Sequence, residues 1–442
     1  MFHLPTLLIQ ILVIMAVARI IGWFFRKIHQ PQVMGEMVAG ILLGPSLFGW
    51  IAPGVSSALF PSESLGFLNS VSQVGLILFM FLVGLELDPQ ILKGRGHTAL
   101  VTSHVSILAP FFLGTILALY LYPRLSDDSV TFTNFALFLG TAMSITAFPV
   151  LARILSERKL LRTQMGAVAI ACAAVDDVTG WCILAGVVLL VRSTDSSVSI
   201  WLNLAGVALY ILIMVFGVRP ILKRLESRYE KRRAISQDML AIILLLVIAS
   251  SWVTESLGIH ALFGAFLLGA VMPKHPAYVH TLSEKLYDGA VVLMLPLFFA
   301  FTGLRTSIGL ISGAQMWFYC GLVIIVAILG KFGGTALAGR VTGMSWREAS
   351  SLGILMNTRG LMELVLLNIG LDIGVISPAL FTMMVLMAVI TTFMTAPLLE
   401  WFYFKRLIPG KYALPSIQIS NPPTSLVPEF VEAEEKSVPN LS

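Results

Sequence analysis

Long apolar runs separated by short polar loops extend from about residue 5 to residue 403. A membrane-spanning helix needs about 20 predominantly apolar residues, because each residue advances ~1.5 Å across a hydrocarbon core ~30 Å thick. By this measure the pattern predicts thirteen spans, at about 5–25, 32–50, 65–87, 98–122, 131–155, 162–192, 199–221, 237–256, 258–276, 285–305, 310–339, 347–371 and 376–403. The predicted fold is therefore an all-α, polytopic membrane protein.

The C-terminal segment differs in composition from the rest of the chain. Residues 1–408 form the predicted transmembrane domain, whereas residues 409–442 are rich in Pro, Ser and Glu. Segments with so few large apolar residues cannot bury enough surface to fold alone. We expect residues 409–442 to be a disordered cytoplasmic tail.

Basic residues alternate between the two sets of predicted loops. One set carries Arg26, Lys27, Lys93, Arg95, Arg158, Lys159, Arg162, the basic segment 223–233, Lys274, Lys285, Arg340, Arg347, Lys405 and Arg406. The opposite set carries only Arg124, Arg192 and Arg305. Because cytoplasmic loops are enriched in Lys and Arg, this predicts an N-terminus outside and a C-terminus in the cytoplasm.

Composition supports a membrane protein and excludes other classes. Hydrophobic residues make up 57% of the chain and charged residues only 12%, about half the share usual in soluble proteins. The net charge of +5 follows the loop pattern, so it does not indicate a nucleic-acid partner. The three cysteines lie in apolar runs without metal-ligand spacing, and no cofactor is expected.

The order of the spans suggests an internal repeat. Two six-span repeats, at about 5–192 and 237–403, would be inverted relative to each other, with 199–221 as a linker helix. Inverted repeats place discontinuous helices at matching positions, with the substrate site between them. The interrupted segments are the fifth, at 140–149, and the twelfth, at 356–363. We expect these two broken helices to cross near the middle of the membrane.

Two adjacent aspartates, Asp176 and Asp177, lie halfway along the span at 162–192. One carboxylate at mid-depth costs roughly 2.5–3.5 kcal/mol on insertion scales, so ionisable residues there serve a function by default. Neighbouring positions on a helix point ~100° apart, so one carboxylate can face an ion while the other faces a partner. The pair predicts an ion or proton site inside a transporter.

Lys331, in the interior of the span at 310–339, is the natural partner for this acidic pair. A lone lysine in the membrane would cost as much as a lone aspartate, which favours pairing. A desolvated lysine can also carry a proton. A side chain that reaches the membrane surface is the alternative.

The broken segments carry the remaining candidates. In the fifth, Thr141, Ser144 and Thr146 offer oxygen ligands, and Pro149 removes a backbone donor and predicts an opening of the helix. In the twelfth, Asn357 could cap a half-helix. Arg359 and Glu363 stand four residues apart and are expected to pair. Both a structural role and a role in the ion path stay open for these residues.

Several segments together resemble a known family. The stretches 30–46, 84–88, 141–155, 173–178, 355–364 and 387–397 are similar to the monovalent cation:proton antiporter-2 family, over about residues 5–405. The resemblance extends to plant cation/H⁺ exchangers and bacterial sodium/proton antiporters. It implies a sodium/proton antiporter-like fold and a homodimer in which a mobile core carries the ion. It also implies that Asp177 binds cation and proton alternately, while Asp176 pairs with Lys331.

The Asp176–Asp177 pair indicates which cation the protein is expected to transport. Plant exchangers and Kef-type systems usually have Asn-Asp or Gln-Asp here, whereas Asp-Asp resembles the electrogenic sodium/proton antiporters. We therefore expect Na⁺, with Li⁺ or K⁺ as alternatives. A K⁺/H⁺ exchanger, a Kef-like K⁺ efflux system and a sodium-coupled organic-anion symporter stay as other hypotheses. The host would be the cell inner membrane or an organellar membrane such as the thylakoid.

Overall fold

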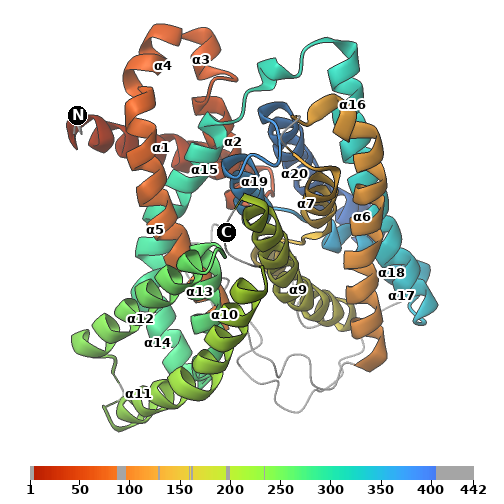
Figure 1. Cartoon of the computed structure of the whole chain (residues 1–442). Helices are drawn as coiled ribbons and strands as arrows, with labels where there is room; N and C mark the ends of the chain where they lie inside the picture. Colours follow the sequence, from red (N-terminus) through yellow and green to blue (C-terminus); the bar gives the residue numbers. More distant parts are fainter. Residues whose placement is uncertain are drawn as a thin grey trace, which may run out of the picture. The chain divides into compact units, whose positions relative to one another are not determined.

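The computed structural model describes residues 4–86, 96–127, 130–158, 160, 163–195, 200–232 and 234–404, and all regular structure in them is helical (Figure 1). The predicted tail at 409–442 lies outside the described residues. The first half contains α1 Leu4–Lys27, α2 Gln32–Leu43, α3 Phe48–Ile51, α4 Pro53–Leu59, α5 Ser62–Glu86, α6 Gly96–Leu125, α7 Phe132–Ser144, α8 Phe148–Glu157, α9 Gln164–Asp195, α10 Ile200–Leu212, the π-helix η2 Ile213–Val218 and α11 Arg219–Arg232.

The second half contains α12 Gln237–Ser256, α13 Ala261–Val271, α14 Pro276–Tyr287, α15 Leu295–Leu304, α16 Gly313–Ile328, α17 Gly334–Val341, α18 Trp346–Met356, α19 Leu361–Asp372 and α20 Pro378–Leu399. Shorter segments complete it: the π-helices η3 Asp288–Met294, η5 Leu329–Gly333 and η6 Glu400–Phe404, and the 3₁₀-helix η4 Ile308–Leu310. The all-helical prediction is confirmed.

Fewer than thirteen helices of the described residues pass a test of length and apolar composition for crossing a membrane. Within the described residues, eleven helical segments are long and apolar enough to cross, and α18 with α19, bent by 44°, would be a twelfth. The predicted span at 258–276 corresponds to α13, which has only 11 residues. A helix of that length covers roughly 16 Å, too little for a hydrocarbon core. The count of thirteen is therefore not confirmed.

The chain divides into two compact units that do not follow the predicted repeats. The first unit is Met1–Ile21, Glu36–Pro89 and Trp181–Thr306, and the second is Gly22–Gly35, Gln90–Gly180 and Ser307–Ser442. Each unit draws segments from both halves of the sequence. The predicted inversion of the two repeats stays a prediction.

The first unit is held by close backbone contacts at glycines. A Cβ added at Gly303 of α15 would lie 1.9 Å from the carbonyl carbon of Gly40 in α2, and one at Gly84 of α5 would lie 2.1 Å from the carbonyl oxygen of Phe266 in α13. Such approach distances are possible only without a side chain, as in other membrane helix pairs. Lys274 closes the α5 end, because its Nζ donates to the carbonyls of Gly84 and Leu85, each at 2.8 Å.

The second unit contains all the candidate site residues. α6 packs on α7, α17 on α18, and α16 on α20. A buried apolar cluster joins α8, the first turns of α9 and α18, and includes Leu151, Cys172 and Leu355. This cluster places two interrupted helical segments and α9 around one polar centre.

We predict that Gly303→Ala destabilises the first unit by about 1–3 kcal/mol, because the added methyl group forces α15 away from α2. Thermal unfolding of the purified protein in detergent checks this. Gly289→Ala in η3 is the matched control, since a Cβ there meets nothing within 4 Å. Equal unfolding temperatures for the two variants would contradict the packing account.

Candidate ion-binding site

Two helix breaks meet in the second unit. The first break, Ile145–Ala147, separates α7 from α8, and the second, at 357–360, separates α18 from α19. The Thr146 hydroxyl lies 3.0 Å from the carbonyl oxygen of Met356 and shares its one proton between this oxygen and Asp176 Oδ2. The backbone N–H of Ala147 donates to the carbonyl of Thr358 at 2.9 Å. Each break thus supplies partners for backbone groups of the other, as the membrane interior requires.

The proline does not mark the opening itself. Pro149 is the second residue of α8, where a helix needs no backbone donor. The chain opens four residues earlier, at Ile145, which adopts an extended conformation. The helix therefore opens about one turn before Pro149, and not at Pro149 as the sequence predicts.

Arg359 caps the carboxyl end of α7 by hydrogen bonds to its backbone carbonyls. Its guanidinium donates to the carbonyls of Ala142 and Met143, at 2.8 and 2.7 Å, and to the Glu363 carboxylate at 2.7 Å. Both charged side chains are fully buried. The last carbonyls of a helix have no partner inside that helix and carry partial negative charge, so a buried cation is well placed there. The structure brings Arg359 and Glu363 together as a brace between the two broken segments.

Lys331 lies beside Asp176. It is on the π-helical turn η5 and is fully buried, and its Nζ is 2.7 Å from Asp176 Oδ2. The same ammonium group donates to the carbonyls of Ser106, at 2.9 Å, and Ser144. The three acceptors satisfy the three N–H bonds of the ammonium group. A route to the membrane surface for this side chain is thereby excluded.

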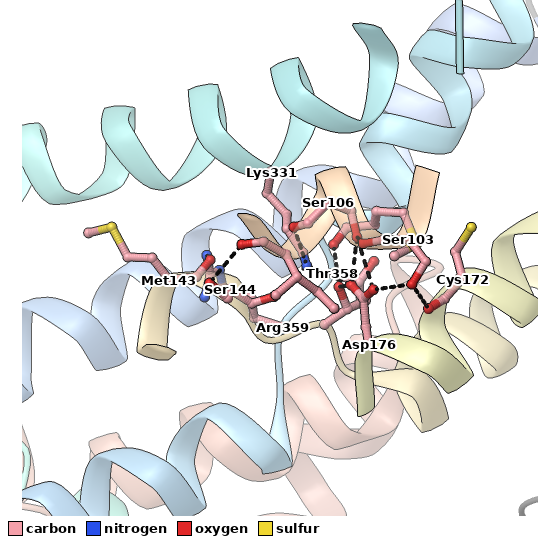
Figure 2. A network of polar contacts seen from close by, with 12 residues as sticks. Ser103, Ser106, Met143, Ser144, Cys172, Asp176, Lys331, Thr358 and Arg359 are labelled. Carbon is pink, nitrogen blue, oxygen red and sulfur yellow. Dashed lines mark hydrogen bonds and ion pairs between the residues drawn. The ribbon is translucent and has the colours of Figure 1, made fainter. Parts of the chain in front are cut away.

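Three hydroxyl groups complete the surroundings of Asp176 (Figure 2). Ser103 donates to Oδ1 at 3.1 Å, Ser106 reaches both carboxylate oxygens at 3.0 and 2.9 Å, and Thr146 donates to Oδ2 at 2.9 Å. Sequence reasoning missed Ser103 and Ser106, which are one turn apart on α6. Asp176 therefore has one cation and three hydroxyl groups as its hydrogen-bond partners.

Asp177 has a different environment. Its side chain is 2% exposed, and neither carboxylate oxygen forms a hydrogen bond among the described residues. The backbone N–H of Phe148, the first residue of α8, interacts electrostatically with this carboxylate without the geometry of a hydrogen bond. A helix N-terminus favours negative charge. Among the described acids of this centre, Asp177 has both carboxylate oxygens free of hydrogen bonds, whereas Glu363 has only Oε1 free and binds Arg359 through Oε2.

The other predicted oxygen ligands are already engaged. The Ser144 hydroxyl shares its one proton between the carbonyls of Ile107 and Gly140, at 3.0 and 2.8 Å, and the Thr141 hydroxyl donates to the carbonyl of Leu137 at 2.7 Å. Thr146 contacts Asp176. Asn357 is the cap residue at the end of α18, and its buried Oδ1 forms no hydrogen bond within the part of the chain that the structure describes. The described residues contain no group of three or more His, Cys, Asp or Glu side chains that could hold a metal ion.

The sequence is similar to a family of known membrane proteins. Residues 12–402 match the transmembrane sodium/hydrogen exchanger family. The chain belongs to this family. Its members are transporters and not enzymes, and the match covers both helix breaks and the buried acidic pair.

Individual relatives extend the comparison. The chain is 44% identical to the Na⁺/H⁺ antiporter NhaS4 of Synechocystis over 398 residues, which cover 90% of this chain and 97% of that protein. It is 42% identical to cation/H⁺ antiporter 17 of Arabidopsis thaliana and 35% identical to K⁺/H⁺ antiporter 1 of Saccharomyces cerevisiae. Each match covers 90% of this chain, but the chain spans only about half of the plant and yeast proteins, 48% and 46%.

The fold resembles a solved antiporter structure. The sodium proton antiporter MjNhaP1 of Methanocaldococcus jannaschii superposes with a TM-score of 0.59 at 14% identity, over 89% of this chain and 96% of that chain. At this identity the likeness concerns the fold alone. The predicted sodium/proton antiporter-like fold is confirmed.

We predict that Arg359→Met destabilises the protein by about 3–5 kcal/mol, because Glu363 loses its partner while staying buried. Replacing both residues, Arg359→Met with Glu363→Leu, recovers part of the loss, since an apolar pair leaves no buried charge. Thermal unfolding in detergent measures both variants.

Arg340→Met is the matched control, because this arginine is exposed and its loss should change the unfolding temperature little. If Arg359→Met unfolds at the same temperature as this control, the bracing role assigned to Arg359 is wrong.

Proposed function

We propose that this protein exchanges a monovalent cation for protons across a membrane by alternating access, and that Asp177 is the carboxylate for which cation and proton compete. The observation that carries the proposal is the contrast between two neighbouring buried acids. Asp176 has four donors, whereas neither oxygen of Asp177 has a hydrogen-bond partner among the described residues. Of these two acids, Asp177 is the one that can accept a new positive charge without losing a hydrogen bond to a described residue.

The proton and the cation compete because both bind the single negative charge of the Asp177 carboxylate. A protonated Asp177 is neutral and does not attract a cation, and an ionised Asp177 in a dry site does so strongly. Exchange then requires that the protein change its accessible side only when Asp177 carries a proton or a cation. The apparent affinity for the cation should therefore fall as the pH falls.

Oxygen ligands for the cation would come from the nearby break. Thr146 and Ser144 donate their hydroxyl protons elsewhere, but each hydroxyl oxygen keeps acceptor positions. Alkali cations bind such oxygen ligands, as hard cations do generally. Thr141, Asn357, Arg359 and Glu363 would act by holding the broken helices in place.

Sodium is the first candidate for the cation, with lithium or potassium as alternatives. The 44% identity to a protein described as an Na⁺/H⁺ antiporter favours Na⁺, whereas the yeast relative is described as a K⁺/H⁺ antiporter. The proposal includes a homodimer in the cell inner membrane or an organellar membrane. The loop charges favour an N-terminus outside and a C-terminus in the cytoplasm.

We predict that Asp177→Asn reduces exchange to the level of protein-free liposomes, because an amide cannot alternate between a proton and a cation. Proton efflux from proteoliposomes after addition of Na⁺, Li⁺ or K⁺, between pH 6 and 9, measures this. Asp372→Asn is the control with the same change in formal charge at an exposed position on α19.

Normal exchange by Asp177→Asn would reject the competition mechanism. A response to K⁺ alone would assign the protein to K⁺/H⁺ exchange. Cation movement without proton movement would favour a Kef-like efflux system, and uptake of an organic anion with Na⁺ would favour a symporter.

A second prediction concerns Lys331. If Lys331 gives up its proton when the cation binds, each cycle exchanges two protons for one cation and moves one net charge. A potential of 100 mV would then change the driving force by about 2.3 kcal/mol. We expect the wild-type rate in liposomes clamped with valinomycin to depend on voltage, and that of Lys331→Gln not to. A voltage-independent wild type would contradict the involvement of Lys331 in proton transfer.

A further inference from the structure

Positive charge is concentrated at the end of one helix of the first unit. There α10, η2 and α11 follow one another without a break, from residue 200 to residue 232 (Figure 1). The sequence from 219 to 233 contains seven Lys or Arg residues and two glutamates, a net charge of +5. The whole chain also has a net charge of +5, so the charges outside this segment sum to zero. The end of this helix is thus the main basic feature of the protein.

The basic side chains at the start of α11 have no partner within the protein. Arg219, Lys223 and Arg224 are exposed, and none of the three side chains forms a hydrogen bond or an ion pair with a described residue. Other basic side chains differ, since Lys274 donates to three backbone carbonyls and Arg347 to a carbonyl of η6. Arg219 and Lys223 are also four residues apart on one helix, where like charges repel each other. An anion from outside the protein would relieve this repulsion.

The depth of these side chains fits the headgroup region of a bilayer. The apolar span that leads into α11 is Ala205–Arg224, and Phe216 within it is 74% exposed, as expected for a side chain that faces hydrocarbon. At ~1.5 Å per residue, Arg219 lies ~4 Å and Lys223 ~10 Å beyond Phe216 along the helix. The polar layer on each side of the hydrocarbon core is roughly 5–8 Å thick. The long basic side chains can therefore reach the lipid phosphates.

Another face of α11 is fixed to the protein. Tyr229 is buried, and its hydroxyl donates to the carbonyl of Ala277 in α14 at 2.9 Å. Its ring packs edge-on against the ring of Tyr278, with centroids 5.3 Å apart. Leu222, two turns earlier on the same face, is also buried. Because α11 is already held in place, a ligand on its exposed face does not have to order the helix.

We propose that the basic face of α11, formed by Arg219, Lys223 and Arg224, binds the headgroups of anionic phospholipids in the adjoining leaflet. Guanidinium groups form paired hydrogen bonds with phosphate, and the lysine adds a point charge. Each Lys or Arg near an anionic membrane surface raises the affinity roughly fivefold. A zwitterionic headgroup has no net charge, so the face selects anionic lipids. The proposal goes beyond ion exchange and does not depend on it.

Native mass spectrometry of the full-length protein in a non-ionic detergent tests the proposal. The protein is titrated with dioleoylphosphatidylglycerol and, separately, with dioleoylphosphatidylcholine, and the lipid-bound fraction is measured. We expect the wild type to bind the anionic lipid roughly tenfold or more tightly than the zwitterionic lipid. Replacing Arg219, Lys223 and Arg224 together by glutamine should remove most of this preference. Arg219→Lys with Arg224→Lys keeps the charge and should keep most of the preference.

The matched control removes three positive charges from other exposed positions, Arg26→Gln with Arg124→Gln and Arg340→Gln. None of these residues lies on α11 or α14, so the preference for the anionic lipid should stay close to that of the wild type. Three results would overturn the proposal: no preference in the wild type, an unchanged preference in the triple variant of α11, or an equal loss in the control.

The other candidate occupant is an acidic stretch of the same chain. Its glutamates are Glu429, Glu432, Glu434 and Glu435. If the preference for the anionic lipid arises only after all four are replaced by glutamine in the full-length chain, this stretch occupies the basic face and the proposal is wrong. A preference that is the same with and without these glutamates supports the lipid as the occupant.

Discussion

The structure of the candidate site depends on one constraint, that helix ends inside a membrane must find partners for their backbone groups. The carboxyl end of α7 presents the carbonyls of Ala142, Met143 and Ser144. Arg359 takes the first two and Lys331 takes the third. Two buried cations thus neutralise the negative end of one half-helix. Each cation is in turn balanced by a buried carboxylate, Glu363 or Asp176.

This arrangement separates the roles of the two neighbouring aspartates. Asp176 is needed to balance Lys331, and three hydroxyl groups hold it in that role. Asp177 points elsewhere, because adjacent residues of a helix differ by ~100° in direction. The Asp177 carboxylate lies instead near the backbone N–H of Phe148, at the positive N-terminus of α8. The same helix therefore carries one carboxylate with four hydrogen-bond donors and one with none among the described residues, and our proposal assigns the second to the exchanged ions.

Much of this organisation could be predicted from the sequence, because apolar length and buried charge are strong signals in membranes. The apolar runs located the helices, and the cost of an isolated charge pointed to Asp176, Asp177 and Lys331. The apolar pattern over 258–276 did not show that only 11 of these residues are helical, because it hides the helix start after the cap residue His260 and the helix end at Val271. Nor could it single out Ser103 and Ser106, because serines are common in membrane helices and only the register of α6 against α9 gives them a role. The sequence also could not show that the carbonyls of Ala142 and Met143 accept from Arg359, because every residue has a backbone carbonyl.

The most direct test of the account is proton release on cation binding, measured with purified protein in weakly buffered detergent, where no transport occurs. The account predicts that Na⁺ or K⁺ displaces protons from the wild-type protein and displaces none from Asp177→Asn at the same pH. Equal proton release from the two proteins would show that the competing carboxylate lies elsewhere, and would contradict the role assigned to Asp177.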